Sequence, residues 1–172
     1  SHALDQGRTE AIHFDTAVFT NLTRDHLDYH HTMEAYGQAK ARLFHSLGLK
    51  NAVLNADDPY SDTILNHLPP KIKTTLLTTA ATLNRPAATR GICLSHFDIR
   101  TSGIEAEVDG DWGHGEMRAK LLGKFNLSNL LSTLAVLLHH EVPMRQALEV
   151  LSRLNPVKGR MQHFGGITGP LV

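Results

Sequence analysis

The sequence predicts an α/β fold: a mostly parallel, helix-covered sheet with a small antiparallel meander. Two patterns indicate this class. From Ala11 to Thr79, short apolar runs alternate with segments of helical spacing, which is typical of parallel strands joined by covering helices. From about residue 91 to residue 123 the alternation has a period of two and is broken by Ser-Gly, Asp-Gly and His-Gly, which favours antiparallel strands and tight turns.

The first half of the chain supplies the predicted parallel strands. The apolar stretch "AIHFDTAVFTNL" predicts a buried strand through Ala17–Thr20. Thr32 resembles an N-cap, and the apolar spacing in "MEAYGQAKARLFHSL" predicts a helix after it. Ala52–Leu54 predicts a short strand that ends in a turn, where Asp58 precedes Pro59 at the start of the next helix. The segment "IKTTLLTT" predicts a further strand.

The second half predicts the meander and two helices. The segment "GICLSHFDIRTSGIEAEVDGDWGHGEMRAKLLG" is expected to form about three antiparallel strands. Asn126–Glu141 is strongly apolar and Met144–Leu154 is amphipathic, and both are expected to be helices. The whole chain, residues 1–172, is therefore expected to form one domain that includes the meander.

Composition argues against several classes of function. Lys+Arg and Asp+Glu both number 17, so a basic nucleic-acid-binding protein is not expected. Cys93 is the single cysteine, which excludes an internal disulfide and a CxxC zinc pair and fits a reducing cytoplasm. Apolar runs such as Leu130–Leu138 are too short to cross a bilayer, and the first residues do not resemble a secretion signal. We therefore expect a cytoplasmic protein without nucleic-acid or membrane partners.

The stretch "RDHLDYHHTMEAYGQAK" is dense in histidines and acids. It follows the first predicted strand at its carboxyl end, where open α/β sheets bind ligands. His26 could bind a divalent cation through one ring nitrogen, while a neighbour such as Asp25 or a backbone carbonyl holds the other. One alternative is an Asx-type turn with surface histidines. Another is a metal-dependent hydrolase with His26 and His30 as a zinc pair, although the glutamate that zincins carry after the first histidine is missing.

Lys40 has two interpretations. Most lysines on helices are solvated, but Lys40 lies between Ala39 and Ala41 and within one turn of Tyr36 and Phe44. A partly buried amine would hold its proton less tightly and could capture carbon dioxide as a carbamate. The product is an anionic oxygen donor that suits a hard divalent metal.

Two further segments carry candidate nucleotide contacts. Asn126 and Asn129 lie one turn apart at a helix start, and their carboxamides could contact a base edge; alternatively, Asn126 simply caps the helix. Arg160 follows Gly159 in a predicted loop and could clamp a phosphate with two hydrogen bonds. The alternative for Arg160 is an ordinary surface charge.

The segments "FTNLTRDHLDYHHTMEAYGQAKARLF", "NADDP", "LLGKFNLSNLLSTLAVL" and "LNPVKGRMQHFGG" resemble, in order and spacing, the central domain of the Mur ligases. The resemblance implies that His26 binds Mg²⁺ and that Lys40, once carbamylated, helps to hold the ion. It places Asn126 and Asn129 beside ATP and Arg160 near the ATP phosphates. His30 and His31 are expected to be peripheral.

The resemblance also implies a reaction in peptidoglycan precursor synthesis. An ATP-dependent ligase would add a diamino acid, meso-diaminopimelate or lysine, to UDP-N-acetylmuramoyl-L-alanyl-D-glutamate through an acyl phosphate. Gln6, Arg8 and Ser1 fall where the family contacts this UDP-muramoyl-dipeptide.

The expected domain is a fragment of such a ligase. The sequence lacks the G-x-x-x-x-G-K-[ST] phosphate loop, and the uridine-binding and amino-acid-binding domains of the family are also absent. We therefore predict that the chain alone is inactive. A non-catalytic α/β binding module is the remaining alternative for the chain itself.

Overall fold

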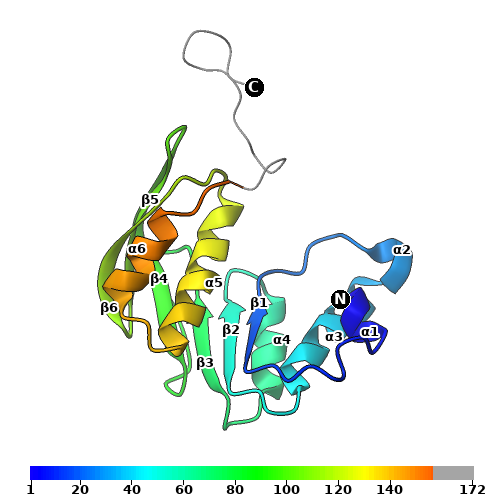
Figure 1. Cartoon of the computed structure of the whole chain (residues 1–172). Helices are drawn as coiled ribbons and strands as arrows, with labels where there is room; N and C mark the ends of the chain where they lie inside the picture. Colours follow the sequence, from blue (N-terminus) through cyan, green and yellow to red (C-terminus); the bar gives the residue numbers. More distant parts are fainter. Residues whose placement is uncertain (157–172) are drawn as a thin grey trace, which may run out of the picture.

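The computed structural model describes residues 1–156, and its strands form one six-stranded sheet in the order β1-β2-β3-β4-β5-β6 (Figure 1). The first four strands pair in parallel, whereas β4, β5 and β6 pair antiparallel. The strand bounds are β1 Thr16–Phe19, β2 Asn51–Asn55, β3 Lys73–Leu77, β4 Arg90–Arg100, β5 Gly103–Gly110 and β6 Gly113–Ala119. The predicted fold class is confirmed, and the meander is continuous with the parallel sheet through β4.

Six α-helices and one 3₁₀ helix, η1, accompany this sheet within residues 1–156. Their bounds are α1 His2–Asp5, α2 Leu27–His30, α3 Met33–Ala41, η1 Arg42–His45, α4 Tyr60–His67, α5 Phe125–His139 and α6 Met144–Ser152. The predicted cap of α3 is confirmed, since Thr32 Oγ1 accepts a hydrogen bond of 3.1 Å from the backbone N–H of Ala35. None of these helices is long and apolar enough to cross a membrane.

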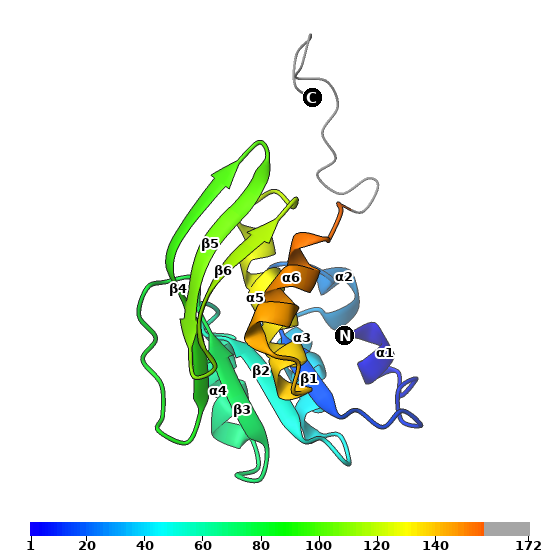
Figure 2. The ribbon, with the colours of Figure 1, turned by 60° about the vertical axis from the view of Figure 1, so that its left-hand side comes forward.

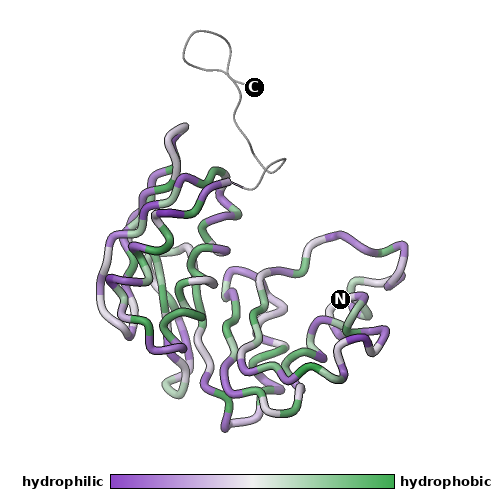
Figure 3. Tube along the Cα trace, viewed as in Figure 1, coloured by the Kyte–Doolittle hydropathy of each residue, from purple (hydrophilic) through white to green (hydrophobic). Residues whose placement is uncertain are grey.

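The helices cover both faces of the sheet (Figure 2). On one face α5 packs against β2 and β3, while α6 packs against β6. The opposite face is covered by the segment that includes η1 and α4. Every residue of β2 is buried: Val53 belongs to the core on the α5 side, and Ala52 and Leu54 belong to the core on the α4 side. Figure 3 shows hydrophobic residues running through the sheet and α5. A strand covered on two faces reads as a continuous apolar run.

The turns of the meander depend on glycines with positive φ. Gly103 (φ 136°), the glycine of the predicted Ser-Gly turn, begins β5, and Gly113 (φ 105°) begins β6. An added Cβ at Gly103 would collide with the backbone oxygen of Ala119. The second turn lies at Asp111–Trp112, so the Asp-Gly and His-Gly pairs fall inside strands.

Candidate functional site

The loop after β1 is held at the carboxyl edge of the parallel strands by residues of the "NADDP" segment. The Asn55 Nδ2 donates a hydrogen bond of 2.7 Å to the Thr20 carbonyl. Asp58 accepts from the backbone N–H of Leu22 at 2.6 Å through Oδ2, and from that of Tyr60 at 2.9 Å through Oδ1. Asp58 therefore connects the first residue of α4 to the loop that leads to the histidine-rich stretch.

Asp57 holds a second loop at the same edge. It accepts hydrogen bonds from the Thr78 hydroxyl and from the backbone N–H and hydroxyl of Thr79, the last two at 2.9 and 2.7 Å. Burial by itself would raise the pKa of Asp57, but these hydrogen bonds and the charge of Lys124 bring it below its ordinary value. An ionised carboxylate therefore lies at this edge of the sheet, and the positive charge of Lys124, the residue before α5, helps to keep it ionised.

His26 lies at the N-cap position of α2 with a left-handed backbone, φ 55° and ψ 23°. Its backbone N–H donates to Asp25 Oδ1 at 2.8 Å, so Asp25 makes a local turn contact. The imidazole is 43% exposed, and its Nε2 lies 3.6 Å from Asp25 Oδ2. The predicted Asx-type contact is therefore present in the structure. The His26 imidazole remains accessible to a ligand.

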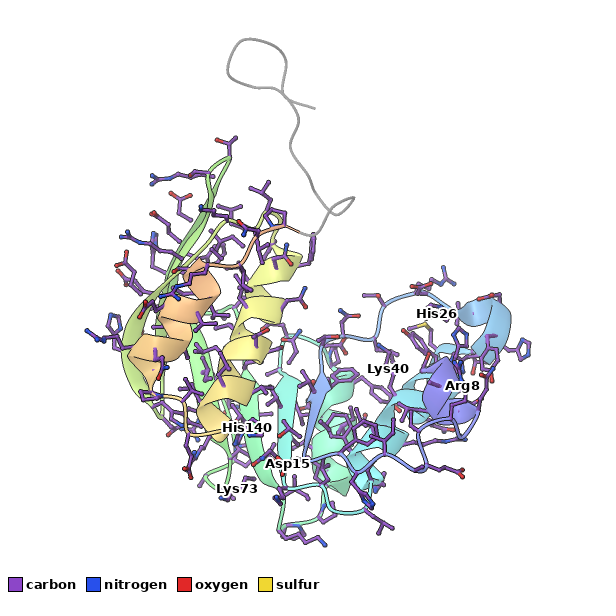
Figure 4. All side chains as sticks on the ribbon, in the orientation of Figure 1. Arg8, Asp15, His26, Lys40, Lys73 and His140 are labelled. Carbon is purple, nitrogen blue, oxygen red and sulfur yellow. The ribbon has the colours of Figure 1, made fainter. Side chains whose placement is uncertain are left out.

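Lys40 reaches from α3 back to the loop after β1. Its Nζ donates a hydrogen bond of 2.9 Å to the Asn21 carbonyl and lies 4.9 Å from the ring centroid of Tyr36. The His26 ring meets the same Tyr36 ring edge-on, at 5.8 Å between centroids and 86° between planes. Figure 4 shows His26, just before α2, and Lys40, on α3, in the same part of the molecule. The structure therefore brings the two predicted metal-site residues together around one aromatic ring.

His30 is part of this cluster, contrary to the expectation that it is peripheral. It is 6% exposed and stacks on Tyr36 with 5.2 Å between centroids. Its Nε2 lies 3.0 Å from the Ser1 hydroxyl, and burial lowers its pKa below the ordinary value. His2, which the sequence analysis missed, contacts the His26 ring at 4.9 Å. The sequence around His2 carries no signal for this contact. His31 is exposed, as expected.

The zinc pair of the hydrolase alternative is not assembled within residues 1–156. Within residues 1–156 no three or more His, Cys, Asp or Glu side chains gather as a metal site. His30 is buried and pairs with Ser1, so a His26–His30 zinc site lacks both an available second ligand and a third one. A carbamate oxygen on Lys40 would be a suitable ligand for Mg²⁺, which is ordinarily bound by one or two carboxylates together with water and substrate phosphates.

The predicted substrate contacts Gln6 and Arg8 follow α1 directly, and both are exposed. Asp5, at the end of α1, accepts a hydrogen bond of 3.1 Å from the Tyr29 hydroxyl and pairs with Arg42 at 2.9 Å. These contacts tie α1 to α2 and to the helical segment after α3. The segment that carries Gln6 and Arg8 is therefore fixed to the same elements as the His26 and Lys40 pair (Figure 4).

The predicted nucleotide residues lie in the first turns of α5. The Asn126 Nδ2 donates to the Leu122 carbonyl at 2.6 Å, and the Asn129 Nδ2 donates to Asn126 Oδ1 at 3.3 Å. The helix begins at Phe125 with Lys124 as its N-cap residue, so the interpretation of Asn126 as a cap is wrong. Asn129 is exposed and could face a ligand. Arg160 lies outside the described residues.

Comparison with known proteins identifies similar sequences. The profile of the Mur ligase middle domain matches residues 1–137. Enzymes named UDP-N-acetylmuramoyl-L-alanyl-D-glutamate–2,6-diaminopimelate ligase are 42% identical in Chromobacterium violaceum, 42% in Neisseria meningitidis and 44% in Xanthomonas campestris. Each alignment covers 100% of this chain and 34% of the relative. The chain thus spans about a third of the length of these relatives.

Solved structures give a consistent result. A structure of UDP-N-acetylmuramoyl-L-alanyl-D-glutamate–2,6-diaminopimelate ligase superposes with a TM-score of 0.81 at 32% identity, over 96% of this chain and 33% of that one. The MurF ligase from Thermotoga maritima in complex with ADP superposes with a TM-score of 0.74 at 19% identity, over 95% of this chain and 36% of that one. The second likeness concerns the fold alone.

Proposed function

This chain belongs to the Mur ligase family, and from that membership we propose that it is the middle domain of an ATP-dependent ligase of peptidoglycan precursor synthesis. The proposed reaction joins 2,6-diaminopimelate to UDP-N-acetylmuramoyl-L-alanyl-D-glutamate. The names of relatives 42–44% identical across the whole chain support this choice of substrates. The observation that carries the proposed chemistry is the shared contact of His26 and Lys40 with Tyr36.

The proposed reaction has two steps. First, a carboxylate oxygen of the dipeptide attacks the terminal phosphorus of ATP, which forms an acyl phosphate and releases ADP. Second, an amino group of diaminopimelate attacks the acyl carbon, the C–N bond forms, and inorganic phosphate leaves while the amine loses a proton. Several anionic oxygens come together in both steps. The site must therefore contain groups that neutralise negative charge.

Lys40 would meet part of that requirement in a modified form. The ammonium first loses a proton to solvent, and the neutral nitrogen then attacks the carbon of dissolved CO₂. A C–N bond forms, one C=O electron pair moves to oxygen, and loss of a second proton leaves an anionic carbamate. This change converts a cation into an oxygen donor. We propose that the carbamate and the His26 imidazole hold Mg²⁺, which supplies charge neutralisation between carboxylate and phosphate.

The proposal extends to the remaining residues that the sequence analysis named. Asn126 and Asn129 would contact the nucleotide, and Arg160 would contact its phosphates. Gln6, Arg8 and Ser1 would contact the UDP-muramoyl-dipeptide. A cytoplasmic location, where ATP and the UDP precursor are available, is part of the same proposal.

The direct test is an assay of phosphate release by the full-length protein. We expect release that requires ATP, Mg²⁺, the UDP-muramoyl-dipeptide and diaminopimelate together, with a UDP-tripeptide as product. The 172-residue chain should release none, because its sequence contains no G-x-x-x-x-G-K-[ST] phosphate loop. Zinc-dependent hydrolysis without ATP would instead support the hydrolase alternative, and turnover by the isolated chain would contradict the prediction of an inactive fragment.

A further inference from the structure

Tyr36 lies at the centre of the residues proposed to bind the metal. It is 4% exposed and projects from α3, one turn before Lys40. Its ring contacts the edge of the His26 ring, the face of the His30 ring and the Lys40 Nζ. No other ring within residues 1–156 contacts both His26 and Lys40. Asn21 and Phe19 also contact Lys40, and His2 and Asp25 also contact His26, but Tyr36 is the side chain that connects the imidazole to the amine.

Each contact of the Tyr36 ring has a preferred geometry. The His26 contact is edge-to-face at 86°, an arrangement that aromatic pairs favour. The His30 contact is stacked at 20°, and His30 is also held by Ser1 and by the stacked His2 ring. The unmodified Lys40 ammonium lies within the range in which a cation is attracted to a ring, so this contact places the amine before the carbamate forms. A buried ring with three oriented neighbours has little freedom to shift.

We propose that Tyr36 is a positioning residue that sets the separation between the His26 imidazole and the Lys40 amine. The ring does this and the hydroxyl does not, because all three contacts are made by the ring. The proposal rests on the proposed function, since the separation matters for catalysis only if the pair holds a metal through the carbamate. Misplacing a catalytic group by about 1 Å can reduce a rate by about a hundredfold.

The test uses NMR spectroscopy of the 172-residue chain in ¹³C-labelled bicarbonate and Mg²⁺. In the unaltered chain and in Tyr36→Phe, the Lys40 Hε protons should be shifted upfield by the ring and should show contacts with it. In Tyr36→Leu that shift should disappear, and the carbamate signal on Lys40 should fall roughly tenfold, the scale on which metal affinity falls when a residue that supports a ligand is removed. Tyr29→Leu is the matched control, because Tyr29 contacts His2 and His30 and has no such contact with Lys40. It should leave the Lys40 signals unchanged.

Two results would overturn the role of Tyr36: Lys40 signals that are the same in Tyr36→Leu and in the unaltered chain, or loss of the shift in Tyr36→Phe. If the Leu variant does not fold, the NMR contacts of the Tyr36 ring in the unaltered chain provide the test. Contacts with both Lys40 and His26 support the proposed role of Tyr36, and their absence refutes that role. Absence of any carbamate signal, with these contacts present, counts against the proposed function and leaves the positioning of the pair standing.

Discussion

Replacing Lys40 with arginine should reduce the ligase rate of the full-length protein by about a thousandfold, the scale expected when charge stabilisation of a transition state is removed. Arginine keeps a positive charge and can remain over the Tyr36 ring, but a guanidinium cannot form the carbamate. Lys40→Ala should lose as much activity. Acetate or propionate should restore part of the rate of the alanine variant, because either carboxylate can occupy the space of the carbamate. Steady-state phosphate release measures both effects.

Lys50→Arg is the control for this substitution. Lys50 is 73% exposed and forms an ion pair of 2.7 Å with Asp15, which arginine can preserve. Its rate should stay within about twofold of the unaltered protein, the scale of exposed surface changes. A Lys40→Arg variant that retained more than about a tenth of the rate would refute a carbamate requirement, because an obligatory group is worth far more.

His26→Ala should lower the rate by about a hundredfold or more and raise the Mg²⁺ concentration needed for half-maximal activity, because a metal ligand is removed. His31→Ala is a matched control. His26 and His31 both have positive φ, 55° and 63°, and both are exposed in the same short segment. Both variants place alanine at positive φ; His26 lies near the left-handed region with ψ 23°, whereas His31 with ψ −37° lies outside it, so the control carries the larger backbone strain. Of these two histidines, only His26 has a ring contact with Tyr36. His31→Ala should therefore change the rate by no more than a few fold.

Equal losses in the two variants would show that the effect comes from the loop backbone and not from a ligand. The Mg²⁺ titration separates these cases further, since a misfolded loop lowers the rate at every Mg²⁺ concentration. A His26→Ala variant that responds to Mg²⁺ like the unaltered protein would exclude His26 as a ligand.

Local patterns predicted the elements of this fold well. The strand through Ala17–Thr20 is β1 within a residue or two, and Thr32 caps α3. The helix predicted at Asn126–Glu141 is α5, Phe125–His139. Such elements are encoded by apolar periodicity and capping residues within the segment itself. The prediction that Asn126 caps this helix is wrong. The chain turns at Gly123, which has a positive φ of 86°, and the helix already begins at Phe125.

The contacts that build the candidate site could not be predicted in this way. Tyr29 bonds to Asp5 across 24 positions, and Leu22 bonds to Asp58 across 36. Such pairs depend on how distant segments pack, which the periodicity of a segment does not encode. The sequence analysis therefore identified Lys40 and His26 as chemically suitable, but it missed Tyr36 as the ring between them and His30 as its stacked partner.

The central claim is that His26 and a carbamylated Lys40 bind the same divalent ion. Mn²⁺ can replace Mg²⁺ at oxygen-rich sites and broadens NMR signals of nearby nuclei. Titration of the 172-residue chain with Mn²⁺ should broaden the His26 ring signals and the Lys40 carbamate carbon together, and only when bicarbonate is present. Broadening of His26 that does not depend on bicarbonate, or a Lys40 carbamate signal that Mn²⁺ leaves sharp, would contradict it.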